Sequence, residues 1–97
     1  MIVSVSADAM ADVRQAIDWY VAHNAIDAAI GLQREMARAL SLLADLPGLG
    51  SPSGHGTRAW PLRRFHVSLI YRVGGGQLRV IAVASHRRKP GYWNDRH

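Results

Sequence analysis

Cysteine is absent from the 97-residue sequence, and this absence excludes disulfide bonds and thiolate metal sites. A domain that holds together without disulfides suits a reducing compartment, so we expect a cytoplasmic location. No segment approaches the roughly 18 consecutive apolar residues of a membrane-spanning helix. The first five residues also lack the basic region and the long apolar stretch of a signal peptide. The sequence therefore predicts a protein that neither spans a membrane nor follows that route of secretion.

Acidic residues are nearly missing from the second half of the chain. Residues 51–97 contain eight Arg and one Lys but a single acid, Asp95, so their net charge is +8, whereas residues 1–50 carry −3. Lysine is also scarce, since eleven of the twelve cations are Arg, whose planar guanidinium favours bidentate and stacked contacts. A surface that only keeps a protein soluble mixes both signs. The asymmetry therefore predicts a positively charged face and an anionic partner, either nucleic acid or an acidic protein.

Clusters of metal ligands and phosphate-binding glycines are absent as well. No two histidines have the i, i+4 spacing of a helical metal site, and the five are scattered along the chain at His23, His55, His66, His86 and His97. The glycines between residues 48 and 56 lack the lysine and the following helix that a phosphate-binding loop requires. We therefore expect neither a metal ion nor a cofactor.

The first half of the chain has the periodicity of two helices. A short β-branched run at residues 2–5 predicts a strand, and Ser6 is a suitable N-cap for a helix that ends near Asn24. Apolar side chains at three- and four-residue spacing predict a second helix from about Asp27. Pro47 stops this second helix. Two helices with so short a connection form an antiparallel hairpin.

The second half changes from helical to alternating periodicity after residues 47–56, where Pro, Gly and Ser predict an exposed loop. The strands expected after this loop, with a glycine turn at residues 74–76 before the last one, span residues 57–62, 65–73 and 78–84. The resulting order, β-α-α-β-β-β, describes a single α+β domain over residues 1–97. In this domain the helical hairpin packs on a mainly antiparallel four-stranded sheet.

The last twelve residues, His86–His97, hereafter called the tail, follow directly on an apolar strand-like run. They hold three consecutive cations at residues 87–89 and the adjacent aromatic side chains Tyr92 and Trp93. Three neighbouring cations are costly to bury and cannot all pair with the few acids available, so this run is the strongest functional candidate. Two places are open for Trp93: it covers the sheet beneath a capping turn, or it is an exposed anchor of a binding surface.

Four segments, taken in order, form a pattern over nearly the full length of the chain. They are LLADLPGLG, RAWPLRRF, LIYRV and VIAVASHRRKPGYW, at residues 42–50, 58–65, 69–73 and 80–93. Each segment alone is weakly diagnostic, but their order and spacing resemble the RelE/ParE superfamily of small bacterial toxins from type II toxin–antitoxin systems. Within it the chain is more similar to the ParE branch. The resemblance implies the superfamily's fold, which agrees with the α+β order above.

The resemblance implies one of two activities. RelE-branch toxins cleave mRNA on the ribosome, whereas the studied ParE-branch toxins inhibit DNA gyrase and have no known hydrolytic chemistry. For cleavage, Arg87 and Arg88 could stabilise the phosphorane, while His86 or Tyr92 could transfer a proton. RelE-type enzymes usually carry a further Arg or another polar catalytic group in the third strand, where this chain has Ser68. We therefore favour a non-enzymatic ParE-like gyrase inhibitor. The first alternative is a ribosome-dependent endoribonuclease, and the second is a non-toxic basic nucleic-acid-binding module.

The resemblance also implies a cognate antitoxin whose extended, acidic segment covers the active face of the toxin. We expect the target, which is DNA gyrase or alternatively the ribosome with its mRNA, to contact five residues of the tail: Arg87, Arg88, Lys89, Tyr92 and Trp93. The residues expected to bind the antitoxin are Arg58, Arg64, Arg72 and Arg87.

Several of these residues have structural alternatives. Arg58 and Arg72 could instead pair on the sheet with acids of the first half, such as Asp12, Asp18 or Glu35. His86 could form a hydrogen bond with a neighbouring backbone group. Three further aromatic side chains are expected in the core or partly buried against the hairpin: Trp60, Phe65 and Tyr71.

Overall fold

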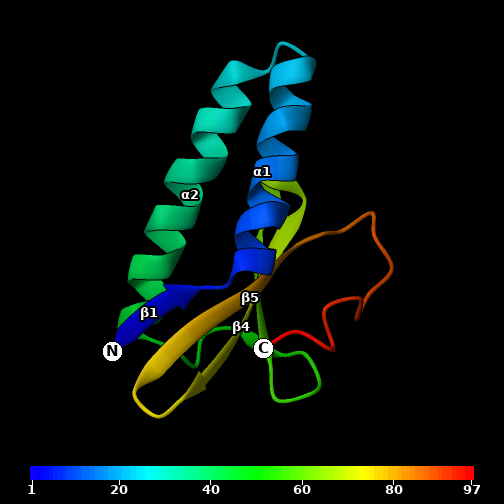
Figure 1. Cartoon of the computed structure of the whole chain (residues 1–97). Coiled ribbons are helices and arrows are strands. Elements are labelled where there is room, and N and C mark those ends of the chain that lie inside the picture. The colour runs from blue at the N-terminus through cyan, green and yellow to red at the C-terminus, as the bar shows by residue number, and fades with distance from the viewer.

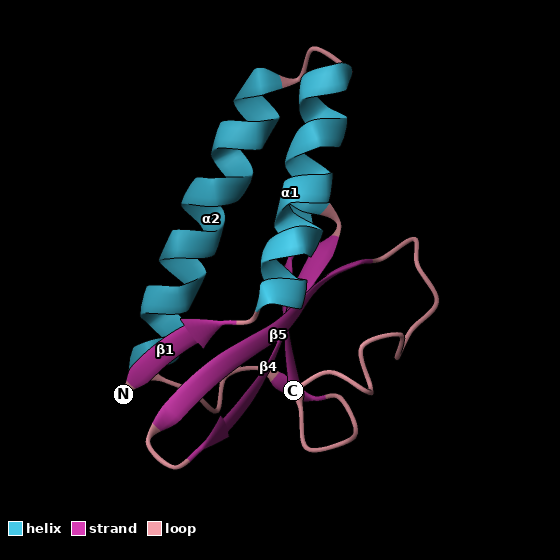
Figure 2. Cartoon of the chain, viewed as in Figure 1, coloured by secondary structure: helices cyan, strands magenta, loops and turns pink.

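Five strands form a single sheet, and two antiparallel helices lie on one side of it (Figures 1 and 2). The structure, a computed structural model, describes residues 1–97. Its elements in chain order are β1 (Ile2–Val5), α1 (Ala7–Ala22), α2 (Ile26–Asp45), β2 (Ser51–Pro52), β3 (Arg58–Leu62), the 3-10 turn η1 (Arg63–Phe65), β4 (Val67–Gly74) and β5 (Gln77–Ser85). In space the strands follow the order β1-β5-β4-β3-β2. β1 runs parallel to β5, and the other pairs are antiparallel.

The predicted α+β order is confirmed, with one strand more than expected. β2 has two residues and lies inside the segment 47–56, where the composition predicts a loop. Its backbone pairs Ser51 with Ala59 and Pro52 with Arg58. The sequence does not reveal this strand because Pro and Ser are typical of turns, and two residues are too few to show alternation. Pro52 fits here because β2 is the edge of the sheet, where a missing N–H removes no bond between strands.

Capping side chains and backbone conformation explain where the helices begin and end. Ser6 is the N-cap of α1, and its hydroxyl oxygen accepts a hydrogen bond from the backbone N–H of Ala9 at 3.0 Å. After α1 the chain turns at Asn24, whose φ of 55° is left-handed and is tolerated by Asn better than by most side chains. α2 begins one residue earlier than predicted and ends two residues before Pro47. Neither helix combines the length and the apolar character that crossing a membrane requires.

The main hydrophobic core lies between the hairpin and the sheet. Leu32 and Leu43 of α2 and Tyr71 of β4 are completely buried in it. The predicted burial of Phe65 and Tyr71 is confirmed, and Trp60 packs at the margin of the core with part of its surface exposed. Burying each large apolar side chain stabilises the fold by about 1.5–3 kcal/mol. This core therefore holds the hairpin on the sheet.

A second, smaller core covers the opposite face of the sheet. Its buried residues are Ile70, Ile81, Ala82, Ala84 and Trp93. The register of β4 and β5 shifts here because Ile81 has no partner on β4, and this bulge lets Ile81 and Ala82 face the same side. Trp93 is only 8% exposed, so of its two possible places the structure has the one that covers the sheet. Ile70 of β4 is therefore buried under the tail.

The tail folds back along the sheet, and the C-terminus lies beside it (orange to red in Figure 1). Arg72 of β4 donates to the carbonyl oxygen of Arg96 at 2.7 Å, and Arg79 of β5 donates to the main-chain oxygen of His97 at 3.1 Å. These hydrogen bonds fix the end of the tail to two strands.

The alternative in which Arg58 and Arg72 pair with acids of the first half is wrong. Arg58 donates to the carbonyl oxygen of Gly50 at 2.7 Å, and Arg72 donates to that of His55 at 3.1 Å as well as to the tail. Backbone carbonyls of the neighbouring loop lie within reach of both guanidinium groups, whereas no carboxylate lies within ion-pairing distance of them. Both arginines therefore order the loop between α2 and β3.

Candidate partner-binding groove

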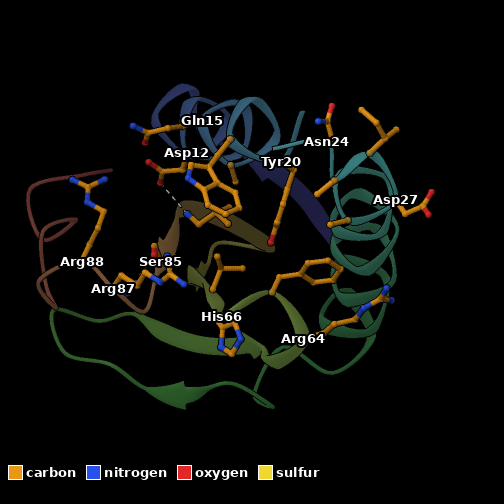
Figure 3. A pocket seen from close by; sticks show the side chains of 18 of the residues that line it. Asp12, Gln15, Tyr20, Asn24, Asp27, Arg64, His66, Ser85, Arg87 and Arg88 are labelled. Atoms are coloured by element: carbon orange, nitrogen blue, oxygen red, sulfur yellow. Dashed lines mark hydrogen bonds between the residues drawn. The ribbon is translucent and has the colours of Figure 1, made fainter. Parts of the chain in front are cut away.

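A groove of about 970 Å³ lies between the hairpin, the end of β5 and the start of the tail (Figure 3). It is lined by α1, by the α1–α2 turn with the first residues of α2, by η1 with the residues that follow it, and by the segment 83–92. Ten of its 19 lining residues are apolar. Its volume is at the upper end of the range for small-molecule sites, about 300–1,000 Å³, so a segment of polypeptide has room in it.

The base of the groove is apolar and aromatic. Phe65 and Val83 are buried there, and Tyr20 meets Phe65 edge to face with ring centroids 6.4 Å apart. At the end near the α1–α2 turn, Trp19 is 51% exposed and stacks on His23, with ring centroids 3.9 Å apart. A half-exposed Trp beside a groove is the type of side chain that most often anchors a protein partner.

Three arginines line the groove and are exposed: Arg64 from η1 and Arg87 and Arg88 from the tail (Figure 3). The Cζ atom of Arg64 lies 5.2 Å from the centroid of the Phe65 ring. None of the three guanidinium groups lies within ion-pairing distance of a carboxylate. The groove therefore combines an apolar base with cations that are free to bind an anionic group.

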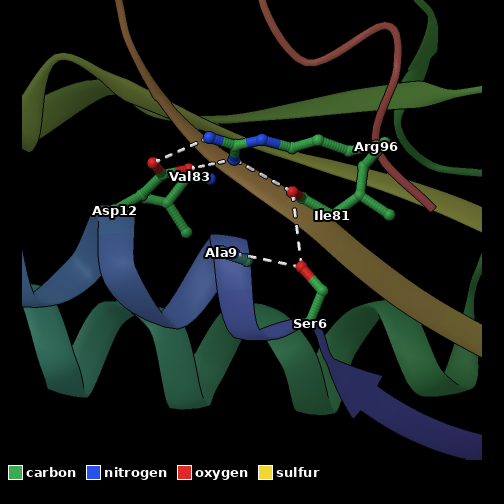
Figure 4. A network of polar contacts seen from close by, with 6 residues as sticks. All are labelled: Ser6, Ala9, Asp12, Ile81, Val83 and Arg96. Carbon is green, nitrogen blue, oxygen red and sulfur yellow. Dashed lines mark hydrogen bonds and ion pairs between the residues drawn. The ribbon is translucent and has the colours of Figure 1, made fainter.

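An ion pair joins Asp12 of α1 to Arg96 near the end of the tail (Figure 4). The two terminal nitrogens of Arg96 reach the two carboxylate oxygens at 2.6 and 3.3 Å, and the side chains are 7% (Asp12) and 19% (Arg96) exposed. Asp12 also accepts a hydrogen bond from the Val83 N–H at 3.0 Å, and Arg96 donates to the Ile81 carbonyl at 3.1 Å. Here β5 extends past the end of β1, so the ion pair satisfies backbone groups that have no neighbouring strand. The hydrogen bond to Asp12 raises the pKa of Arg96 above its ordinary range.

Two guanidinium groups lie over the ring of Tyr92. The Cζ atom of Arg88 is 3.6 Å from the ring centroid, and that of Arg96 is 5.1 Å away. The Tyr92 hydroxyl is buried and has no hydrogen-bond partner. Burial and the negative charge of Asp12 raise the pKa of Tyr92 above its ordinary value of 10.0, against the opposing influence of the two arginines. Tyr92 is therefore held neutral, with its hydroxyl withdrawn from solvent.

Replacing Tyr92 with Phe is expected to remove one tyrosine that ionises above pH 10 when tyrosinate absorption is titrated. Because the folded pKa exceeds the unfolded one, Tyr92 contributes stability that is present below pH 10 and is lost as the pH rises through the folded pKa. The variant should lack this loss. At neutral pH its free energy of unfolding should be unchanged or higher by up to about 1 kcal/mol, because a buried unpaired hydroxyl is removed. If the tyrosine missing from the variant's titration is one that ionises at or below pH 10, this assignment is contradicted.

The fold and the groove invite comparison with known proteins. A family model described as "ParE toxin of type II toxin-antitoxin system, parDE" matches residues 3–90. The chain belongs to the ParE toxin family. A chain of the solved "Chromosomal ParDE TA system from P. aeruginosa" is similar to it, with a TM-score of 0.76 and 24% sequence identity over 88% of this chain and 95% of that chain. At this identity the likeness establishes the fold alone. No curated protein matches the sequence.

The tail of this ParE toxin presents only some of the residues expected to bind the target. Arg87 and Arg88 line the groove, and Lys89 is exposed beside them. Tyr92 is half-buried and Trp93 is buried. The three cations are therefore accessible to a partner, whereas the two aromatic side chains hold the tail on the sheet.

The four arginines expected to bind the antitoxin fall into two pairs. Arg64 and Arg87 line the groove from opposite sides, one from η1 and one from the tail (Figure 3). Arg58 and Arg72 do not line the groove and are engaged with backbone carbonyls. The structure thus brings one pair to the groove of the ParE toxin and uses the other pair to order loops.

Of the groups that RNA cleavage would need, Arg87, Arg88 and Tyr92 line the groove of this ParE toxin, whereas His86 does not. His86 lies outside the groove lining, and its Nε2 atom is 2.9 Å from the hydroxyl oxygen of Ser68. No carboxylate forms a hydrogen bond with either residue. No group of three or more His, Asp or Glu side chains is arranged as metal ligands would be.

Two features of the site are absent from the predictions made from the sequence: the residues of α1 that line the groove, and the role of Arg96. Asp12, Gln15 and Trp19 recur at three- and four-residue spacing, which places them on one face of the helix. Trp19, an aromatic side chain on an otherwise polar helical face, is the sequence feature that could have indicated this surface. Arg96 carries no such signal, because its partner Asp12 is 84 residues away in the sequence.

Proposed function

We propose that this ParE toxin inhibits DNA gyrase by binding to it and does not cleave nucleic acid. The observation that best supports this is the state of Tyr92, whose hydroxyl is buried without a partner and so is poorly placed to transfer a proton. Ser68 supplies no cation where RelE-type enzymes usually have one, which would cost about 2–4 kcal/mol of transition-state stabilisation. Ser68 instead lies within hydrogen-bonding distance of His86. The exposed side chains of the site are therefore suited to binding a partner and not to proton transfer.

The exposed cations of the tail, Arg87, Arg88 and Lys89, are the proposed contact with gyrase. Charge-assisted hydrogen bonds from arginine to carboxylate are among the stronger polar contacts between proteins. No carboxylate of the chain pairs with these three side chains. They therefore fit an acidic patch on the target.

The groove is proposed as the binding site of the cognate antitoxin. An acidic, amphipathic segment of the antitoxin would place carboxylates against Arg64 and Arg87 and apolar side chains on the base formed by Phe65 and Val83. Trp19 offers an anchor at the far end. Because Arg87 lies in both proposed surfaces, a bound antitoxin would compete with the target for it. This competition explains how the antitoxin would neutralise the toxin.

Two parallel assays of the purified toxin test this proposal. We expect the toxin to block the supercoiling of relaxed plasmid by gyrase and to leave mRNA intact in a translation reaction. A short reading frame with an acidic carboxy-terminal half should lie beside this one, and its product should restore supercoiling. Cut mRNA that appears only with ribosomes, together with unimpaired supercoiling, would establish the endoribonuclease instead. DNA or RNA binding that weakens steeply with salt, without either effect, would support the basic nucleic-acid-binding module.

The same supercoiling assay tests the tail. Replacing Arg87 and Arg88 together with Ala should raise the toxin concentration for half-inhibition on the order of tenfold or more, because charge-assisted contacts are lost. Arg14→Ala is the matched control, since Arg14 is an exposed arginine outside the groove and the tail. Equal inhibition by the double variant and the control would exclude the tail as the target surface.

A further inference from the structure

We infer that Asp12 and Arg96 are positioning residues that hold Arg88 at the mouth of the groove through the ring of Tyr92. The inference deepens the proposed function and rests on it for the role of Arg88 in binding gyrase. Tyr92 and Arg96 lie beyond residue 90, where the match to the family model ends. Membership of the family therefore does not assign them this role.

The four side chains form a continuous column from α1 to the groove. Asp12 holds the guanidinium of Arg96 at 2.6 Å, and Arg96 lies over the Tyr92 ring with 5.1 Å between its Cζ atom and the ring centroid. The Cζ atom of Arg88 is 3.6 Å from the same centroid, which is stacking distance. Removing either residue at the buried end of the column leaves the Tyr92 ring without one of its supports.

Stacking leaves the binding capacity of Arg88 intact. A guanidinium group that lies on a ring face keeps its in-plane N–H groups free to donate to a carboxylate. No carboxylate of the chain pairs with Arg88. An exposed arginine at a strand end normally samples many rotamers, and fixing it in one of them on binding costs conformational entropy. The column orders Arg88 in advance, so less conformational entropy is lost when the partner binds.

The buried end of the column is rigid. The Val83 N–H donates to Asp12, and Arg96 donates to the Ile81 carbonyl, so both members of the ion pair are also fixed to β5 (Figure 4). The backbone of Arg96 is held separately by Arg72, which donates to its carbonyl oxygen at 2.7 Å. The orientation of the Arg96 side chain over Tyr92 is therefore set by the sheet and by α1.

Nuclear magnetic resonance tests the positioning without reference to gyrase. The ring current of Tyr92 should shift the side-chain protons of Arg88 upfield in the wild-type protein. Arg96→Ala and Asp12→Asn should both abolish this shift. Arg79→Ala is the matched control, because Arg79 also holds the tail through the main-chain oxygen of His97 but does not touch Tyr92, and it should retain the shift.

Asp12→Asn keeps an oxygen that can accept a hydrogen bond from the Val83 N–H and removes the charge. It therefore tests the positioning role even if Arg96→Ala fails to fold. Well-dispersed amide spectra identify the folded variants. Unchanged Arg88 resonances in a folded Asp12→Asn or Arg96→Ala protein would overturn the positioning role. Loss of the shift in the Arg79→Ala control would also overturn it, because general loosening of the tail would then be sufficient.

A double-mutant cycle in the supercoiling assay tests the consequence for binding. Arg88→Ala and Arg96→Ala should each raise the half-inhibitory concentration about tenfold, which corresponds to about 1.4 kcal/mol. The double variant should be no weaker than the Arg88→Ala variant, because Arg96 acts through Arg88. Fully additive losses, or no loss on replacing Arg96, would overturn the inference. If the wild-type toxin does not inhibit gyrase, the proposed function fails, and the ring-current shift alone decides the positioning role.

Discussion

Replacing Arg96 with Ala is expected to lower the free energy of unfolding by about 3–5 kcal/mol. The Asp12 carboxylate is only 7% exposed, and without Arg96 its remaining partner is the Val83 N–H. An uncompensated buried charge costs much more than the intact pair contributes. The Ile81 carbonyl also loses the hydrogen bond from Arg96. In a domain whose total stability is on the order of 5–15 kcal/mol, this is a large fraction.

Urea denaturation followed by circular dichroism measures this loss. Arg38→Ala is the control, because Arg38 pairs with Glu35 at 3.0 Å on the surface of α2 and its side chain is 76% exposed. An exposed pair of this kind contributes within about 0.5 kcal/mol. Replacing Asp12 and Arg96 together with Ala should cost less than replacing Arg96 alone, since the orphaned carboxylate is removed. A double variant less stable than the Arg96→Ala protein would contradict the buried-charge explanation.

Most of the fold follows from patterns that are local in the sequence. Ser6 predicts the start of α1 from the four residues around it, and the glycines at 74–76 predict the turn that β4 and β5 share. The switch from helical to alternating periodicity after Pro47 separates the hairpin from the sheet. Each of these signals depends on neighbours within a few residues, so each can be interpreted without knowing the rest of the structure.

The groove and the second core depend on contacts that no local pattern encodes. The charge of the tail predicts a functional segment, and the structure shows that Trp93 and Tyr92 attach this segment to the sheet. The bulge at Ile81 changes which residues share a face, and alternation alone cannot predict it. The pairing of Asp12 with Arg96 is set by the fold as a whole. In the sequence alone, nothing distinguishes these two residues from the other acids and arginines.

Replacing Gly50 with Ala is expected to lower the free energy of unfolding by about 2–4 kcal/mol, because the new methyl group would overlap Tyr71. A Cβ atom built at Gly50 would lie 2.5 Å from the Tyr71 hydroxyl oxygen and 2.8 Å from its Cε1 atom. Tyr71 is completely buried in the main core and cannot move aside. Its hydroxyl accepts from the Gly50 N–H at 2.9 Å and donates to the Pro47 carbonyl at 2.7 Å, so a shift of the loop breaks these bonds as well.

The matched control is Gly48→Ala, two residues earlier in the same loop, where an added Cβ meets no atom within 4 Å. Its stability should stay at the wild-type level or rise by a few tenths of a kcal/mol, because alanine restricts the unfolded chain more than glycine does. Chemical denaturation of both variants measures the difference. The contact between Gly50 and Tyr71 also gives a physical reason why the segments LLADLPGLG and LIYRV occur together, since the glycine of one accommodates the tyrosine of the other. Equal stability of the two variants would show that the loop can move away from Tyr71, and would remove that explanation for the shared pattern.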